Sequence, residues 1–315
     1  MPGDLTRASI RTAVIAISVN IAIALAKAVA AGITGSAALW AETAHSFADT
    51  GNELLLLIGL RRSRMPRDAR HPFGYGQERW FWAFVAAIGI FIGGGLLSID
   101  QGVDTIRSPR PVGSYGLGVA VLLVSMLLDG FSWRTARREL HDEARVRGRS
   151  FVDYLRVVSD PTAPTVFLED SASLVGLSLA LAGLTLQRMT GSVLWDAGAS
   201  IAIGVLLVVV AFLLAGRSKG LLIDESAPPE MVERLTLRIA AAPWVAGVES
   251  LAAILIAPRR LLVTARVVPT ERAARGGAGE LLALVDRLRE DLLAVEVVAE
   301  VEIGLAAPAS PQAPG

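Results

Sequence analysis

Two long uncharged runs constrain this chain more than any other feature of its sequence. Residues 81–99 and 197–215 each contain 19 consecutive positions without Asp, Glu, Lys or Arg. A helix needs about 20 mainly apolar residues to cross a bilayer, and lipid offers no water to unpaired backbone groups. With 53% hydrophobic and 19% charged residues, the chain of 315 residues is too apolar for a soluble globule. The sequence therefore predicts an α-helical polytopic membrane domain.

Six transmembrane helices are predicted from the apolar segments. If the N-terminus is cytoplasmic, 17 Arg or Lys residues near the spans fall on the inner side and three on the outer side. Because cytoplasmic loops are enriched in basic residues, this predicts a multi-pass protein of the cell (inner) membrane with both termini in the cytoplasm. The glycines at 93–95 fit close helix contact, with a flexible point as the alternative. The predicted spans are residues 10–31, 37–60, 81–106, 112–133, 166–186 and 193–215.

A small α+β domain is predicted after the last span. Apolar residues recur at helical spacing over 231–239 and again over 281–292. Residues 261–268 alternate between polar and apolar side chains, as in a half-buried strand, and 244–256 and 295–303 are also predicted as strands. The predicted domains are a membrane domain over 8–217, a cytoplasmic domain over 224–304 and a disordered tail over 305–315.

The second predicted span carries an unusual concentration of polar residues. Glu42, His45, Asp49 and Asn52 follow one another at spacings of 3, 4 and 3, which places them on one helical face. His45 and Asp49, four residues apart, would present an imidazole nitrogen and a carboxylate to the same divalent cation. Ionisable groups at bilayer depth are costly, so this stripe is a candidate metal site.

Two adjacent carboxylates, Glu169 and Asp170, lie near the start of the fifth span and would complete a four-ligand site. Isolated polar residues have a plainer explanation as helix–helix hydrogen-bond partners. We interpret Asn20, Lys27 and Asp129 in this way, with Lys27 and Asp129 alternatively lying near helix ends and reaching the interface. The concentrated charge of the second and fifth spans is harder to explain as structural pairing.

The chain contains no cysteine, which excludes thiol chemistry and cysteine-based metal sites. A metal must therefore be held by His, Asp, Glu or backbone oxygens. Asp68 and His71, in the loop after the second span, form a possible carboxylate–imidazole pair, and an ordinary turn is the alternative. His141, in an arginine-rich loop, is interpreted as a bystander.

Three segments together carry a family resemblance. They are G-S-A-A-L-W-A-E-T-A-H-S-F-A-D-T-G-N-E-L-L-L from residue 35, H-P-F-G-Y-G from residue 71 and F-L-E-D-S-A from residue 167. With these motifs in this order, the chain resembles the cation diffusion facilitator family, and within it the zinc transporter nine-like branch, over residues 8–304. The resemblance implies six helices, a ferredoxin-like cytoplasmic domain, a homodimer, and exchange of a divalent metal, usually zinc, for protons.

The resemblance also implies a ligand set. The family's pair on the second helix falls on His45 and Asp49, and the aspartate of its H-x-x-x-D pair on the fifth helix falls on Asp170. Val166 stands at the histidine position of that pair, which leaves the neighbouring Glu169 as a substitute. A site with more carboxylates is harder in its ligand character, so manganese, iron or cobalt are alternatives to zinc as the transported ion.

A second family site, in the loop after the second helix, is only partly matched. Asp68 and His71 fit its pattern, but Tyr75 occupies the position of its last histidine, which predicts weakened or absent binding. From Asp224 onward there is no histidine, so zinc-clamped dimerisation of the C-terminal domain is not expected.

Alternating access with proton coupling is the predicted mechanism. An imidazole binds metal only when it is neutral, so protonation of His45 from the outer side would release the ion. A non-transporting metal sensor or scaffold is an alternative, because the fifth-helix histidine is missing. An intramembrane enzyme is disfavoured because the chain has no H-E-x-x-H motif and no nucleophile with a positioned base. Nucleic-acid binding is not predicted, since topology explains the arginine clusters.

Overall fold

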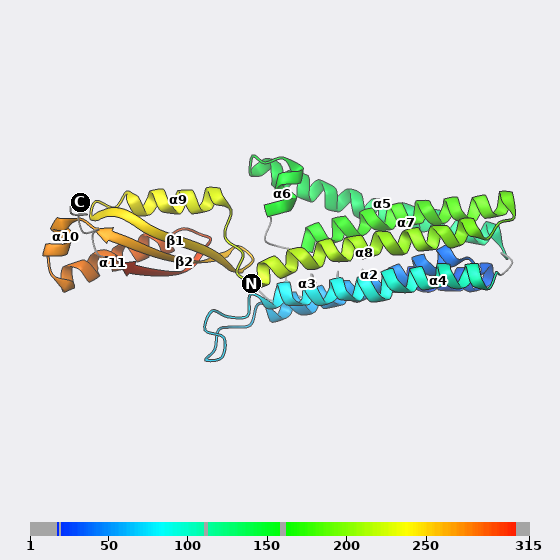
Figure 1. Cartoon of the computed structure of the whole chain (residues 1–315), viewed down its shortest axis with the longest axis horizontal. Coiled ribbons are helices and arrows are strands. Elements are labelled where there is room, and N and C mark those ends of the chain that lie inside the picture. The colour runs from blue at the N-terminus through cyan, green and yellow to red at the C-terminus, as the bar shows by residue number, and fades with distance from the viewer. Residues whose placement is uncertain (1–17, 19, 110–112, 158–161, 307–315) are drawn as a thin grey trace, which may run out of the picture. The chain divides into compact units, whose positions relative to one another are not determined.

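The computed structural model describes residues 18, 20–109, 113–157 and 162–306. These residues form two compact units (Figure 1). One contains the residues up to Arg64 together with Glu78–Lys219, and the other contains Met65–Gln77 and the residues from Gly220 onward. Of the predicted disordered tail, 305–315, Leu305 belongs to the last strand and Ala306 is buried, and the residues from 307 onward lie outside the described residues.

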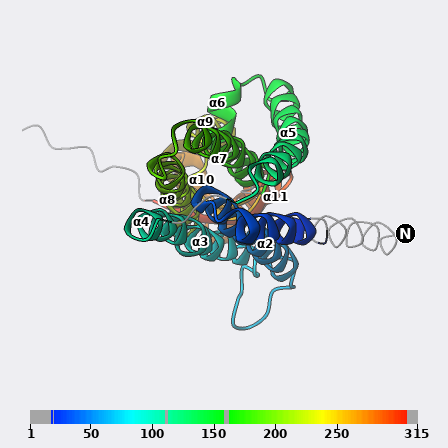
Figure 2. The ribbon, with the colours of Figure 1, turned by 90° about the vertical axis from the view of Figure 1, so that its right-hand side faces the viewer.

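The first unit is a bundle of helices, seen end-on in Figure 2. Its helices are Asn20–Thr34, α2 (Ala37–Arg62), α3 (Glu78–Gly89), the π-helical η1 (Ile90–Leu96), α4 (Leu97–Arg107), α5 (Tyr115–Val146), α6 (Phe151–Val157), α7 (Thr162–Thr190) and α8 (Leu194–Leu222).

Within the described residues, each of the six predicted spans falls on one or more of these helices, whereas α6 matches none of them. Four segments are long and apolar enough to cross a membrane: Glu78–Arg107, Tyr115–Val146, Pro164–Thr190 and Leu194–Leu222. The helix α2 has 26 residues but is not among these four, and polar side chains interrupt its apolar sequence. The first helix is shorter within the described residues. The predicted class, a helical membrane domain with a small α+β domain, is confirmed.

The structure differs most from the predicted spans in two places. The fourth helix continues to Val146, 13 residues past the predicted end, because its Arg- and Glu-rich extension keeps buried apolar positions at Ala136, Leu140 and Ala144. The third span is not uniformly α-helical, since its centre forms η1 where three glycines follow one another. Glycine has no side chain to resist the wider turn, which explains the position of the change.

Small residues bring the third span close to α8, as predicted for helix contact. A side chain at Gly95 would meet Val208, and one at Gly204 would meet the carbonyl of Gly95 and the backbone of Ile99. Gly93, in contrast, faces open space. The packing role is therefore confirmed for Gly95, where the two backbones approach.

A buried carboxylate caps the start of α2. Asp196, 1% exposed on α8, accepts a hydrogen bond from Ser36 Oγ at 2.6 Å and another from the backbone N–H of Ala37. A helix N-terminus presents unpaired N–H groups and a partial positive charge, so a carboxylate there is stabilising. This contact joins α8 to the helix that carries the polar stripe.

The second unit has the predicted order helix–strand–strand–helix–strand, with one extra short helix. β1 and β2 form an antiparallel hairpin, and β3 returns parallel to β2 after the α10–α11 crossover. Its elements are α9 (Pro229–Ala240), β1 (Val245–Ala257), β2 (Arg260–Pro269), α10 (Glu271–Arg275), α11 (Ala278–Leu293) and β3 (Val298–Leu305).

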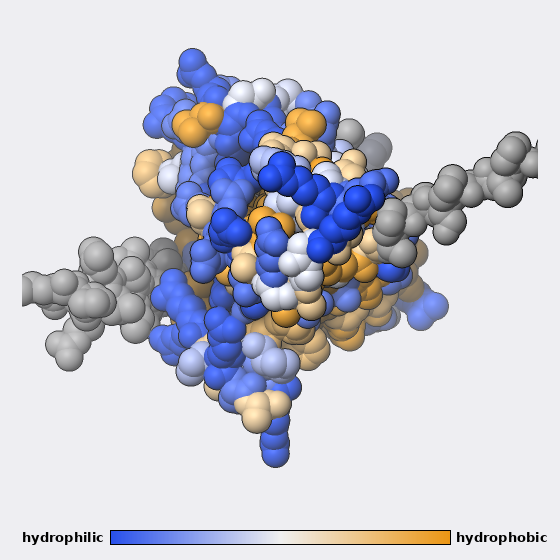
Figure 3. All heavy atoms as spheres, turned by 90° about the vertical axis from the view of Figure 1, so that its left-hand side faces the viewer, coloured by the Kyte–Doolittle hydropathy of each residue, from blue (hydrophilic) through white to orange (hydrophobic). Residues whose placement is uncertain are grey.

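Alternation on β2 produces the core of this unit. Val263, Ala265 and Val267 are fully buried, whereas Thr264 and Arg266 on the opposite face are exposed. Helices α9 and α11 contribute the buried Leu235, Ile239, Leu288 and Leu292. The face seen in Figure 3 is largely hydrophilic, as expected for side chains in water.

The loop over Met65–Gln77 groups with this second unit. Arg67 Nη1 lies 2.7 Å from Glu300 Oε1 on β3, and a side chain at Gly76 would collide with Ala257 on β1. The predicted membrane domain includes this loop as a connector between spans. Its grouping depends on contacts across more than 180 residues of sequence, which no local pattern reveals.

Candidate functional site

The polar stripe of α2 faces the interior of the bundle. Glu42, His45 and Asn52 are at most 2% exposed, and the Asp49 side chain is 25% exposed. Their spacing of 3, 4 and 3 therefore has the predicted structural consequence. Burial of so many polar groups on one helix is costly unless each one has a partner or a ligand.

His45 and Asp49 are adjacent, with 3.3 Å between Nδ1 of the imidazole and Oδ1 of the carboxylate. Neither imidazole nitrogen has a hydrogen-bond partner among the described residues, and Asp49 Oδ1 also has none. Buried polar atoms are satisfied in the great majority of proteins, so three unsatisfied atoms on one helical turn need an explanation. They are the atom types that bind a divalent cation.

The two predicted carboxylates of α7 point to different neighbours. Glu169 accepts a hydrogen bond from the Asn52 amide and so links α7 to α2. Asp170 accepts a hydrogen bond of 2.7 Å from Ser132 Oγ on α5. Adjacent residues on a helix project about 100° apart, which explains this divergence. Within the described part of the chain, no three His, Asp or Glu residues gather closely enough to hold a metal ion.

Lys27 has a partner that the sequence did not identify. Its ammonium lies 3.3 Å from Glu42 Oε2 and donates a hydrogen bond of 2.8 Å to Ser46 Oγ. Lys27 is 1% exposed, so its side chain does not reach the membrane–water interface and that alternative is wrong. Its predicted role as a helix–helix hydrogen-bond partner is confirmed. The pairing could have been predicted from the sequence, because successive spans contain one lysine and one additional glutamate and buried charges require a partner.

The other isolated polar residues also join helices. Asn20 donates a hydrogen bond of 2.7 Å to Glu53 Oε1, and Asp129 on α5 accepts one from Ser173 on α7. The sequence did not identify Ser173 and Ser132 as the hydrogen-bond partners of Asp129 and Asp170 between α5 and α7. A serine is too common in membrane helices to mark a partner from sequence alone.

Comparison with known proteins decides the family. Residues 13–223 match the cation efflux transmembrane domain. The chain belongs to the cation efflux, or cation diffusion facilitator, family. It is 34% identical over 203 residues to the proton-coupled zinc antiporter SLC30A9, mitochondrial, of Homo sapiens, covering 64% of this chain and 36% of the relative.

Two further relatives extend the comparison. Metal tolerance protein C4 of Arabidopsis thaliana is 37% identical over 193 residues, which cover 61% of this chain and 42% of the relative. The cation-efflux pump FieF of Escherichia coli is 26% identical over 249 residues, 76% of this chain and 75% of the relative. The chain thus spans only about two fifths of the length of the antiporter and of the metal tolerance protein.

In this cation diffusion facilitator, the departure on α7 is a side chain that cannot bind metal. Val166 is partly buried one turn before Asp170, at the position where a histidine ligand is expected from the sequence analysis. Glu169, the predicted substitute, is engaged by Asn52. Both carboxylates of α7 are therefore engaged by hydrogen-bond donors, Glu169 by Asn52 and Asp170 by Ser132.

In the second predicted site, in the loop after α2, the carboxylate oxygens already accept hydrogen bonds from residues of the same loop. Asp68 Oδ1 accepts backbone hydrogen bonds from Arg70 and His71, and Tyr75 donates its hydroxyl to Asp68 Oδ2 at 2.7 Å. His71 Nδ1 lies 3.5 Å from Asp68 Oδ1, and its ring is 4.0 Å from that of Tyr75. The hydrogen bond from the Tyr75 hydroxyl lowers the pKa of Asp68 below its ordinary value, and the backbone hydrogen bond from His71 lowers it further.

His141 is exposed on α5, as a bystander would be.

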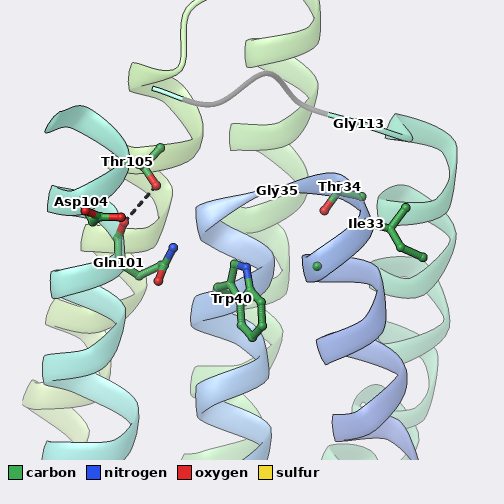
Figure 4. A pocket seen from close by; sticks show the side chains of 9 residues that line it. Ile33, Thr34, Gly35, Trp40, Gln101, Asp104, Thr105 and Gly113 are labelled. Carbon is green, nitrogen blue, oxygen red and sulfur yellow. Dashed lines mark hydrogen bonds between the residues drawn. The ribbon is translucent and has the colours of Figure 1, made fainter. Parts of the chain in front are cut away.

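A pocket of about 300 Å³ opens where the first helix meets α2 and α4 (Figure 4). Trp40 and Gln101 project into it, and Asp104 is its single carboxylate among the lining residues. It does not include His45 or Asp49. Its lining is formed by Gly32, Ile33, Thr34, Gly35, Trp40, Gln101, Asp104, Thr105 and Gly113.

Proposed function

We propose that this protein moves a divalent metal cation, most favourably zinc, across a membrane in exchange for protons. The observation that carries the proposal is the His45–Asp49 pair, in which the nitrogens of the buried imidazole have no hydrogen-bond partner among the described residues. It lies within a cation efflux domain, and relatives of that family are named as proton-coupled zinc antiporters.

The proposed ligands are His45 and Asp49 from α2, joined by Asp170 from α7 and with Glu169 as the substitute for the absent histidine. For Asp170 to join them, its carboxylate has to leave Ser132. For Glu169 to join, it has to exchange Asn52 for the metal. Both are side-chain changes that a small shift of α7 against α2 would produce, which is the motion alternating access requires.

Proton coupling follows from the chemistry of the imidazole. Only neutral His45 can ligate the ion, because a protonated nitrogen has no lone pair to offer, so proton binding and metal binding exclude each other. Protons and the metal ion would also compete for the oxygens of the carboxylate ligands. The proposal includes a homodimer, as the family resemblance implies. It also includes a cell (inner) membrane location with cytoplasmic termini, because 17 of 20 basic residues near the spans lie on that side of the predicted topology.

The test is metal flux into proteoliposomes of the full chain under an imposed pH gradient. Zinc, manganese, iron and cobalt are compared for the wild type, Asp49→Ala, His45→Ala and, as a matched histidine control, His141→Ala. We expect pH-driven zinc flux in the wild type and in His141→Ala, and none in the two site variants. Zinc flux that is unchanged in His45→Ala would refute the assignment of the site.

The same assay separates the alternatives. Retained zinc binding without flux for any of the four metals would indicate a membrane metal sensor or scaffold instead of a transporter. Faster flux of manganese or iron than of zinc would keep the transport function and change its substrate. Zinc flux that is slower in His45→Ala but still driven by the pH gradient would place proton coupling elsewhere in the chain.

A further inference from the structure

Lys27 is placed where a membrane protein seldom puts a charge. Its side chain is 1% exposed, and its ammonium contacts both Glu42 Oε2 and Ser46 Oγ on the next helix. Burying an ammonium costs several kcal/mol unless a close counter-ion offsets the loss of water. The pair therefore fixes the first helix against the stripe of α2.

Glu42 is held from a third direction by α7. A side chain at Gly176 would collide with Glu42 Oε1, so the carboxylate lies directly against the α7 backbone. That oxygen has no hydrogen-bond partner among the described residues. The first helix, α2 and α7 thus meet at one buried carboxylate, one oxygen of which is neutralised by Lys27.

This carboxylate is three residues from His45 and on the same helical face. If it were unpaired, Glu42 would add a second acid of α2 to the neighbourhood of the proposed ion. Carboxylate oxygens favour Mn²⁺ and Mg²⁺, whereas imidazole favours Zn²⁺. The charge state around Glu42 therefore bears directly on which cation His45 and Asp49 retain.

We propose that Lys27 is a specificity-determining residue, which engages Glu42 and so keeps a hard carboxylate ligand away from the cation at His45 and Asp49. This inference rests on the proposed transport function, since it concerns the same site. Lys27 does not touch the ion and acts through Glu42. Its effect is on the preference between metals, beyond any effect on the stability of the bundle.

The experiment measures zinc and manganese dissociation constants of the full chain in detergent by competition with a fluorescent chelator. In Lys27→Met, the ratio of the manganese constant to the zinc constant should fall about tenfold or more, the usual size of an outer-shell effect. Lys27→Arg should keep the wild-type ratio. Lys27→Met/Glu42→Gln, which removes both charges, should return the ratio to near the wild-type value.

Loss of affinity for both metals by the same factor in Lys27→Met would overturn the proposal and leave Lys27 as a helix–helix contact. An unchanged ratio would overturn it as well. If Lys27→Met does not fold, Lys27→Gln is measured instead. Its amide can still donate to Glu42 and Ser46 but leaves the negative charge of Glu42 unpaired, so the ratio should fall in the same direction by a smaller factor. Binding of both metals that is indifferent to His45→Ala would refute the transport site and this inference together, whereas His45-dependent zinc binding with a fixed ratio refutes only the role of Lys27.

Discussion

Both units of the chain pair their charged side chains, but in opposite surroundings. In the helical unit, Lys27 and Glu42 are 1% and 0% exposed. In the C-terminal unit, Arg238 and Asp291 form a two-pronged pair at 2.7 Å with side chains 46% and 47% exposed. The exposed pair has the better geometry, yet solvent screens it, whereas the buried pair has no water to replace a lost partner.

This contrast separates geometry from energetic importance. A short, well-aligned ion pair on a surface contributes little, because water solvates either partner after the other is removed. A longer pair inside the bundle is indispensable once formed, because neither charge can be left alone. Burial, and not distance, should rank the effects of substitutions in this protein.

The largest expected effect is the removal of one buried partner. Glu42→Leu leaves the Lys27 ammonium unpaired and should lower the free energy of unfolding by about 3–5 kcal/mol. The measurement is denaturant unfolding in detergent, followed by tryptophan fluorescence. Lys27→Met/Glu42→Leu is the control and should recover most of the loss. Equal losses in the single and double variants would show that charge burial is not the cause.

A smaller effect is expected from crowding the contact between η1 and α8. Gly204→Ala places a methyl group against the backbone of Gly95 and Ile99, and should cost about 1–3 kcal/mol in the same assay. Gly198→Ala, on the same helix with open space around it, should be neutral or stabilising. A stability of Gly204→Ala at or above that of Gly198→Ala would contradict the packing role.

The cap of α2 should contribute somewhat less. Asp196→Ala leaves the Ser36 hydroxyl and the Ala37 N–H without their acceptor, at a cost of about 1–2 kcal/mol. Asp196→Asn retains one acceptor oxygen and should fall between Asp196→Ala and the wild type. An Asn variant as unstable as the Ala variant would attribute the effect to the charge instead of the hydrogen bonds.

The smallest effect is expected at the exposed pair. Arg238→Ala should not measurably change the unfolding midpoint at pH 7 in 0.15 M salt. Arg238 holds the pKa of Asp291 below its ordinary value, so any contribution is present above about pH 4 and is lost as the pH falls through the lowered pKa. A clear loss of stability at pH 7 would break the ranking by burial, and a low-salt titration would then test its electrostatic origin.

The sequence by itself determined the elements of this protein and the composition of its polar stripe. Helix length, apolar content and spacings of 3 and 4 are local properties, so the spans, the α+β order and the common face of Glu42, His45, Asp49 and Asn52 could all be predicted. The assignment of His45, Asp49, Asp170 and Glu169 as metal ligands remains a prediction.

Only the tertiary structure decided which polar groups meet. Lys27 finds Glu42 over 15 residues, Asn52 finds Glu169 over 117, and Ser36 finds Asp196 over 160. The rotation and depth of each helix result from packing across the whole bundle, which no window of sequence contains. For this reason the residues of the stripe were visible in the sequence, while their partners, including the lysine that engages one of them, were not.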